Sequence, residues 1–160
     1  MAQYTGKVWV LGDDIDTDII IPTEYLALKT IEDMKQYGFS PLRPELAGQI
    51  KPGDIIVAGK NFGCGSSREQ APEVIKALGI PCIIAKSFAR IFYRNALNNG
   101  LLLLEQPELH DVVKEGDTIT VTVNEDVEYN GKKYPIASLP ENLMEIIEAG
   151  GLLNSLKKRM

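Results

Sequence analysis

Side chains that bind metals are scarce in this sequence. Its 160 residues include two cysteines, Cys64 and Cys82, and one histidine, His110. The cysteines lie eighteen positions apart with no Cys-x-x-Cys pair, so the chain by itself lacks ligands for zinc or an iron–sulfur cluster. His110 lies in a polar stretch, and we interpret it as a surface histidine. We therefore expect no metal site in this chain.

Long apolar runs and clusters of positive charge are missing too. The longest apolar stretches, such as residues 101–104, are far shorter than the roughly 20 residues of a membrane-spanning helix. The net charge is −5, and the best basic cluster is residues 157–159 at the end of the chain. We therefore expect neither a membrane nor a nucleic acid as partner. The first residues hold no apolar signal core, so we expect a cytoplasmic protein whose cysteines are thiols.

What remains is the composition of one globular domain. Hydrophobic residues make up 44% of the chain and charged residues 24%, so intrinsic disorder is a poor fit. A chain of this length buries enough surface to fold without disulfide or metal staples. We therefore expect residues 1–160 to form a single domain.

Strand and helix patterns alternate through the middle of the chain. Short apolar runs typical of buried strands occur at residues 55–58, 82–85 and 101–104. Helices are expected between them over residues 73–78 and over residues 88–98, the second with Ser87 as its N-cap. This order favours parallel strands joined by helical crossovers.

Other elements are expected toward the two ends. A β-rich run at residues 7–11 comes first, and residues 25–49 mix Pro, Gly and short helical fragments, which predicts a flexible surface excursion. Near the C-terminus, alternation over residues 117–124 and the pair Asn130-Gly131 predict antiparallel strands and a hairpin. Helices over residues 141–149 and 152–158 are expected to follow. The predicted fold is a layered α/β domain with mixed parallel and antiparallel strands.

A glycine-rich segment, residues 59–69, lies between an expected strand and an expected helix, and we call it the site loop. Backbone N–H groups and the helix dipole favour an anion at such a position. The segment does not match the Walker loop, the Rossmann fingerprint or the nucleophile elbow. It offers instead Ser66, Ser67 and Arg68, whose hydroxyls and guanidinium suit a carboxylate.

A purely structural interpretation of the site loop stays open. Ser66 and Glu69 have the spacing of a capping box, which closes the start of a helix. Capping requires neither a second serine nor an arginine, whose charge opposes the helix dipole unless an anion compensates it. Pro72 limits how far upstream a regular helix begins, which leaves residues 66–69 partly free for a ligand. We interpret Cys64 as a small packing residue.

Aspartates alternate at positions 14, 16 and 18 of the acidic loop, residues 13–18. They begin like a calcium-binding loop, but Ile19 stands where that motif needs glycine and Tyr25 where it needs glutamate. We therefore interpret Asp14 and Asp16 as caps of backbone N–H groups in a turn.

Three segments together resemble the swivel domain of the aconitase superfamily. They are DIDTDII at residues 14–20, GKNFGCGSSRE at residues 59–69 and AKSFARIF at residues 85–92. The resemblance covers about residues 7–105, and the chain is similar in size to the separate small subunits of isopropylmalate dehydratases and homoaconitases. It implies a layered β/β/α swivelling domain that closes over a large subunit carrying a 4Fe-4S cluster, as a heterodimer or heterotetramer.

The resemblance also implies a reaction and residue roles. This family dehydrates and rehydrates small malate-type dicarboxylates, here interconverting 2-isopropylmalate and 3-isopropylmalate in leucine biosynthesis. Ser66 resembles the serine that removes the proton next to a carboxylate. Ser67, Arg68 and Gly65 resemble the groups that bind the substrate carboxylate, and Asp18 resembles an acidic residue at the rim of the site.

In the same family, the loop after Ile-x-Pro selects the substrate, and its counterpart here, Tyr25, Leu26, Ala27 and Leu28, is called the recognition loop. A homoaconitase-like loop has an arginine at the position of Ala27, whereas the apolar residues here suit an isopropyl group. Lys29 keeps the homoaconitase alternative open, and a 2,3-dimethylmalate dehydratase fits equally well. Outside enzymes, the alternative is a non-catalytic module that binds carboxylates.

Overall fold

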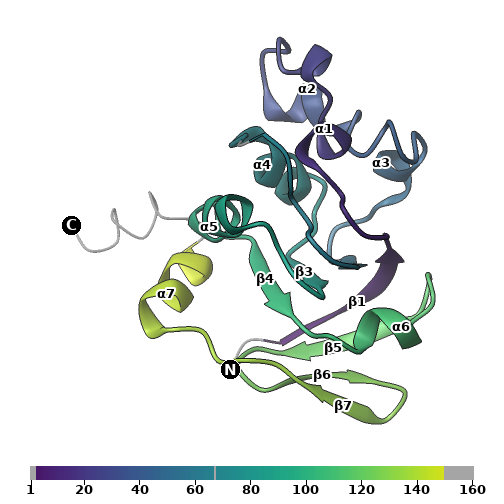
Figure 1. The fold of residues 1–160 in the computed structure, drawn as a ribbon, viewed down its shortest axis with the longest axis vertical. Helices are drawn as coiled ribbons and strands as arrows, with labels where there is room; N and C mark the ends of the chain where they lie inside the picture. Colours follow the sequence, from purple (N-terminus) through teal and green to yellow (C-terminus); the bar gives the residue numbers. More distant parts are fainter. Residues whose placement is uncertain (1–2, 67, 150–160) are drawn as a thin grey trace.

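One sheet and the helices around it make up the described part of the chain, residues 3–66 and 68–149 of a computed structural model (Figure 1). The strands are β1 (Gln3–Val10), β2 (Ile55–Ala58), β3 (Cys82–Ala85), β4 (Leu102–Glu105), β5 (Thr118–Thr122), β6 (Asp126–Tyr129) and β7 (Lys132–Pro135). The helices are α1 (Thr17–Ile20), the 3-10 helix η1 (Thr23–Tyr25), α2 (Ile31–Lys35), α3 (Leu46–Gln49), α4 (Gln70–Ala77), α5 (Arg90–Asn98), α6 (Leu109–Val112) and α7 (Glu141–Ala149). Among these residues, no helix is long and apolar enough to cross a membrane.

The sheet is mixed, with strand order β4-β3-β2-β1-β5-β6-β7. Strands β1 to β4 pair in parallel, and α4 and α5 provide the crossovers from β2 to β3 and from β3 to β4. The first half of β1 pairs antiparallel with β5, which continues into β6 and β7. The predicted α/β fold with mixed parallel and antiparallel strands is confirmed.

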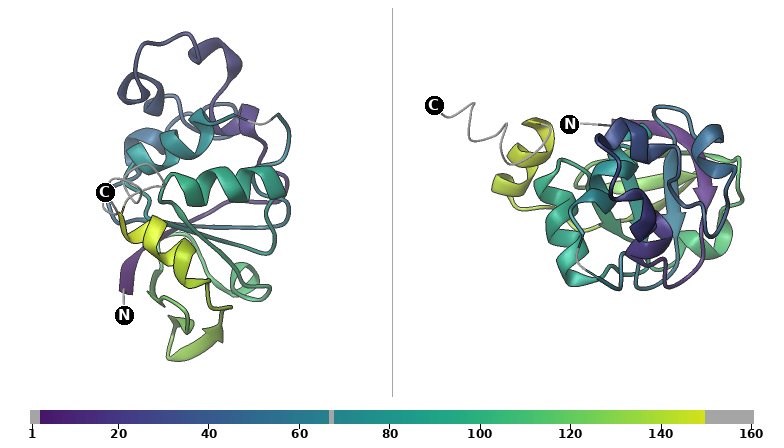
Figure 2. Two further views of the ribbon diagram at one scale, coloured as in Figure 1. Left: turned by 90° about the vertical axis from the view of Figure 1, so that its left-hand side faces the viewer. Right: turned by 90° about the horizontal axis from the view of Figure 1, so that it is seen from above.

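Buried side chains of the parallel strands alternate between two cores. In β2, Ile56 and Ala58 belong to one core, whereas Ile55 and Val57 belong to the other. The first core is covered by α1, α2, α4 and α5, and the second by the antiparallel strands with α6 and α7 (Figure 2). The result is a helical layer, a parallel layer and an antiparallel layer, because each buried strand must cover both of its faces.

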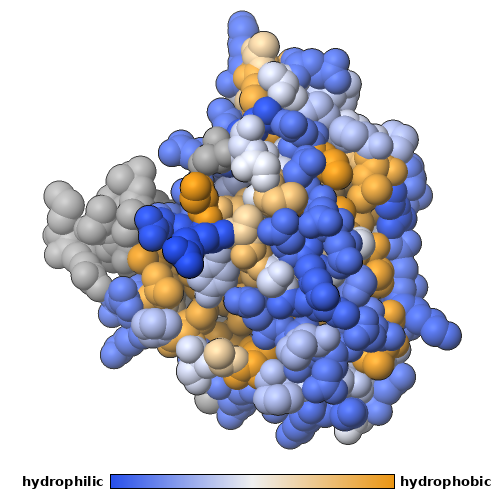
Figure 3. Space-filling model, in the orientation of Figure 1, coloured by the Kyte–Doolittle hydropathy of each residue, from blue (hydrophilic) through white to orange (hydrophobic). Residues whose placement is uncertain are grey.

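Hydrophobic side chains gather on the surface where α7 meets α5 (Figure 3). Leu143 and Met144 of α7 are half-buried and pack against the second core. The α7 helix is therefore held on the molecule by its apolar face, as a short amphipathic helix must be.

Arg43 ties the irregular segment, residues 21–50, to the strands. Its Nη1 and Nη2 donate to the two carboxylate oxygens of Glu115 at 2.6 and 3.0 Å, and this bond lowers the pKa of Glu115. The guanidinium also lies over the ring of Trp9, 5.7 Å from its centroid. Such a bidentate and stacked arginine fixes geometry more firmly than a single ion pair does. The segment that carries the recognition loop is thus anchored at its far end.

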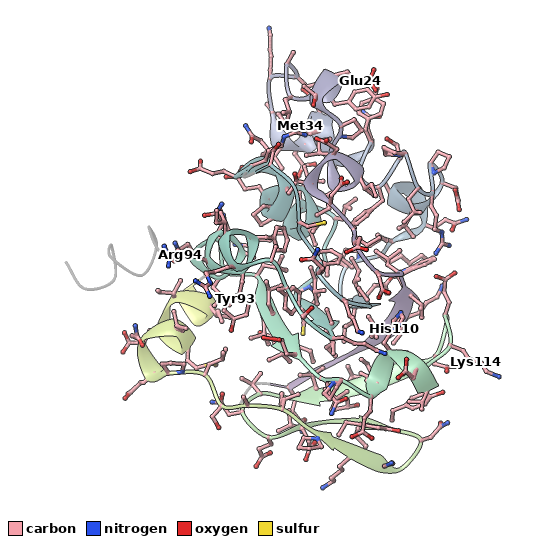
Figure 4. The ribbon with its side chains drawn as sticks, in the orientation of Figure 1. Glu24, Met34, Tyr93, Arg94, His110 and Lys114 are labelled. Atoms are coloured by element: carbon pink, nitrogen blue, oxygen red, sulfur yellow. The ribbon has the colours of Figure 1, made fainter. Side chains whose placement is uncertain are left out.

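Two local expectations are wrong. Ser87 does not cap α5, which begins at Arg90 after Ala89, because the Ser87 hydroxyl accepts a hydrogen bond from the backbone N–H of Asn61 at 2.9 Å. His110 lies in α6, half-buried, with its Nε2 atom 2.8 Å from the carbonyl oxygen of Leu11, so it is not a plain surface histidine (Figure 4).

The expected hairpin is confirmed. Asn130 and Gly131 have φ angles of 50° and 78° between β6 and β7, the left-handed pair that a tight hairpin turn requires. The helix expected over residues 152–158 and the basic residues 157–159 lie outside the described residues.

Candidate active site

Hydrogen bonds tie the site loop to the acidic loop. The N–H of Gly63 donates to the carbonyl oxygen of Ile15 at 2.7 Å, and the N–H of Thr17 donates to that of Cys64 at 2.9 Å. The hydroxyl of Thr17, a buried residue, donates to the carbonyl oxygen of Ser66 at 2.7 Å. The backbone at Ser66 is therefore fixed by residues some fifty positions earlier in the chain.

Glycines let the site loop turn against α5. Gly63 and Gly65 have φ angles of 85° and 90°, a region that other residues adopt at a cost. A Cβ atom on Gly63 would lie only 2.2 Å from the Cγ atom of Phe92, so no larger residue fits there. Gly65 is exposed next to Ser66, where we predicted a contact with substrate.

Ser66 is an exposed residue, and its hydroxyl forms no hydrogen bond with any residue that the structure describes. It is not part of a capping box, because the N-cap of α4 is Glu69 and no side chain caps that helix. The α4 helix begins at Gln70, earlier than predicted, since Pro72 lies in its first turn, where backbone N–H groups have no partner within the helix. The exposed hydroxyl of Ser66 thus takes no part in capping α4.

Arg68 is held by three acceptors. Its Nη2 atom lies 2.6 Å from Oδ1 of Asp18 and donates to the hydroxyl of Thr23 at 2.8 Å, while Nη1 donates to the carbonyl oxygen of Ile21 at 3.0 Å. The Arg68 side chain is 14% exposed, whereas that of Asp18 is 62% exposed. Asp18 therefore balances the charge of the arginine from the outer side of the site. Ser67 lies outside the described residues.

A hollow of about 220 Å³ opens beside Ser66. Its lining comes from the site loop, from Thr17 and from the start of α5: Gly63, Gly65, Ser66, Arg68, Thr17, Ala89, Arg90, Ile91, Phe92 and Asn95. The structure thus brings together three predicted site residues, Gly65, Ser66 and Arg68. It adds Arg90 and Asn95, which were not predicted as site residues, although Arg90 stands in the segment AKSFARIF that carries the family resemblance.

The recognition loop lies apart from the lining of this hollow. Tyr25 stacks on Tyr37 with ring centroids 3.9 Å apart, and Leu26 and Leu28 are half-buried against the first core. Ala27 alone among the four residues is exposed. The hydrogen bond from Arg68 to Thr23 of η1 connects the start of this loop to the site.

The carboxylates of Asp14 and Asp16 in the acidic loop accept hydrogen bonds from other groups of this chain. Asp16 caps α1, since its Oδ1 atom accepts from the N–H of Ile19 at 2.9 Å, which confirms its expected role. Asp14 instead accepts from the side-chain amide of Asn61 at 3.1 Å. Burial and the nearby aspartates raise the pKa of the Cys64 thiol, so it stays protonated.

Within residues 3–66 and 68–149, no three His, Cys, Asp or Glu side chains are grouped so that they could hold a metal ion. This donor set does not fit an iron–sulfur cluster, which is usually held by cysteine thiolates.

Known proteins resemble this chain over nearly its full length. A sequence profile described as the aconitase C-terminal domain matches residues 23–109. A 3-isopropylmalate dehydratase small subunit from Lachnospira eligens is 77% identical over 156 residues, which cover 98% of this chain and 95% of that protein. An isopropylmalate/citramalate isomerase small subunit from Methanocaldococcus jannaschii is 49% identical over 158 residues, covering 97% and 94%.

The fold is shared as well. The crystal structure of a 3-isopropylmalate dehydratase from Methanocaldococcus jannaschii matches with a TM-score of 0.93 at 42% identity, covering 99% of this chain and 95% of that one. The chain therefore belongs to the aconitase C-terminal domain family and, within it, to the 3-isopropylmalate dehydratase small subunits.

Proposed function

We propose that this chain is the small subunit of a hydro-lyase that interconverts 2-isopropylmalate and 3-isopropylmalate by dehydration and rehydration, a step of leucine biosynthesis. The observation that carries the proposal is the hollow in which the unbonded hydroxyl of Ser66 lies together with Arg68. A serine hydroxyl and a guanidinium around a small cavity suit a dicarboxylate that must lose a proton next to one of its carboxylates.

In this proposal Ser66 is the general base. A serine hydroxyl is a weak acid, so its alkoxide needs stabilisation by backbone N–H groups and a nearby cation. The site loop provides both, because glycines leave its backbone accessible at Gly65 and Arg68 lines the same hollow. In the reverse direction the same oxygen returns the proton. Arg68, Gly65 and Ser67 bind the substrate carboxylate, and Asp18 orients Arg68 from the rim.

The reaction also needs a group that assists departure of the hydroxyl. The described residues offer no metal-binding cluster for this purpose. We propose that a large subunit supplies it on a 4Fe-4S cluster and that its surface closes the hollow, in a heterodimer or heterotetramer. This chain then contributes the proton transfer and part of the carboxylate binding.

Mixing the purified chain with a purified large subunit tests the proposal. We expect neither chain alone to convert 2-isopropylmalate, whereas the mixture converts it. The rate should reach a plateau as more of this chain is added to a fixed amount of the large subunit. Binding of a malate-type dicarboxylate by this chain alone, with no turnover in the mixture, would instead favour the carboxylate-binding module.

Substrate choice can be tested at Ala27, the exposed residue of the recognition loop. We expect Ala27→Arg to raise the ratio of kcat/KM for homoaconitate to kcat/KM for isopropylmalate by about tenfold, because an added guanidinium can pair with the extra carboxylate. Rates of the reconstituted complex with each substrate, measured separately, give this ratio.

The control places the same side chain at Ala137, an exposed alanine between β7 and α7, where we expect no change in the ratio. An unchanged ratio for Ala27→Arg would remove this loop from substrate selection. A wild-type complex that prefers homoaconitate would make the homoaconitase reading the better one.

A further inference from the structure

The hollow beside Ser66 contains a second cation, Arg90, at the start of α5. We infer that Arg90 is a substrate-binding residue, which pairs with a carboxylate of the dicarboxylate while Ser66 acts on the neighbouring carbon. The inference rests on the proposed function. Arg90 is not among the site residues that the family resemblance implies.

Arg68 by itself offers limited capacity for an anion. Its three contacts with Asp18, Ile21 and Thr23 occupy three of the five N–H donors that a guanidinium has. The carboxylate of Asp18, 2.6 Å away, balances its charge. A second cation in the same hollow would therefore add to the carboxylate binding that this chain contributes.

Arg90 is free to serve as that cation. It is exposed, and it forms no salt bridge with any residue in the described part of the chain. Among residues 3–66 and 68–149, no side-chain hydrogen bond occupies any of its five donors either. Asn95, half-buried on the same helix, lines the hollow too, and its side-chain amide can donate a further hydrogen bond.

The backbone holds Arg90 at a defined place relative to Ser66. The N–H of Phe62 in the site loop donates to the carbonyl oxygen of Ser87 at 3.1 Å, and the N–H of Ala89 donates back to that of Phe62 at 2.9 Å. The ring of Phe62 also packs edge-on against Phe92, with centroids 5.4 Å apart. The first turn of α5 and the site loop therefore form one packed unit, which is what a site that orients a small substrate requires.

Replacing Arg90 in the reconstituted complex tests the inference. We expect Arg90→Ala to raise KM for isopropylmalate by about tenfold or more, as the loss of a charge-assisted hydrogen bond does, and Arg90→Lys to recover part of the loss. Arg94→Ala is the matched control, because Arg94 is an exposed arginine of the same helix (Figure 4). Arg94 is not among the residues that line the hollow, and we expect the KM of this variant to stay within twofold of wild type.

Two measurements separate this inference from the proposed function. Gel filtration with the large subunit reports assembly, and calorimetric binding of malate to the complex reports carboxylate binding without turnover. Equal KM and equal malate affinity for Arg90→Ala and Arg94→Ala overturn the inference, as does an Arg90→Ala variant that fails to assemble. An inactive wild-type complex overturns the proposed function, and the malate affinities then still decide on Arg90.

Discussion

We expect Ser66→Ala to lower kcat of the reconstituted complex by about a thousandfold, within the range that removal of a general base produces. The substitution removes only the hydroxyl, and no described residue bonds to that hydroxyl. Ser66 is tied to Thr17 through its carbonyl oxygen, which alanine retains. The fold and the rest of the hollow should thus be unchanged, and the loss should fall on the chemical step. Initial rates with saturating 2-isopropylmalate measure it.

The control for Ser66→Ala is a second exposed serine that lies far from the hollow. The hydroxyl of Ser138 donates to the carbonyl oxygen of Asn124 at 3.2 Å, so Ser138→Ala removes a comparable group and one weak hydrogen bond. We expect this variant to keep wild-type kcat, and both variants to co-elute with the large subunit. If Ser66→Ala retains more than a tenth of the wild-type rate, Ser66 is not the base.

The sheet was the most predictable part of the fold. The expected strands at residues 55–58 and 82–85 coincide with β2 and β3, because a short apolar run bounded by turn residues is what a strand buried on both faces requires. Helix starts were less predictable. Serine is a residue type that often caps helices, yet the Ser87 hydroxyl accepts a hydrogen bond from Asn61, twenty-six positions earlier. Rules based on neighbouring residues cannot identify so distant a partner.

The site shows the same division: residues that are neighbours in sequence were predicted, and residues brought in by tertiary contacts were not. Gly65, Ser66 and Arg68 are neighbours in sequence, so a motif finds them together, and they line one hollow. Asp18 was expected only at the rim, and its ion pair with Arg68 spans fifty positions. Arg90 escaped notice because its place in the site depends on hydrogen bonds between Phe62 and the residues before α5. Tertiary contacts of this kind leave no periodic signal in the chain.

For Arg68 we expect the lysine variant to lower kcat/KM by about a hundredfold, mainly through KM. A guanidinium is a rigid fork that can hold Asp18, Thr23 and the Ile21 carbonyl and still present N–H donors to a substrate carboxylate. The single ammonium of lysine has three donors and no fork, so it cannot satisfy these acceptors and the substrate together. Saturation curves of the reconstituted complex separate KM from kcat.

An alternative explanation of such a loss is that Arg68 merely holds the start of the recognition loop in place. The double variant Asp18→Asn and Thr23→Val distinguishes the two roles, because it removes an ion pair and a hydrogen bond from Arg68 but leaves its guanidinium. If the guanidinium binds substrate, this variant loses much less in kcat/KM than Arg68→Lys, since freed donors and an uncompensated charge attract the carboxylate at least as well. Equal losses for the two variants would assign Arg68 to the scaffold and leave Arg90 as the cation that binds substrate.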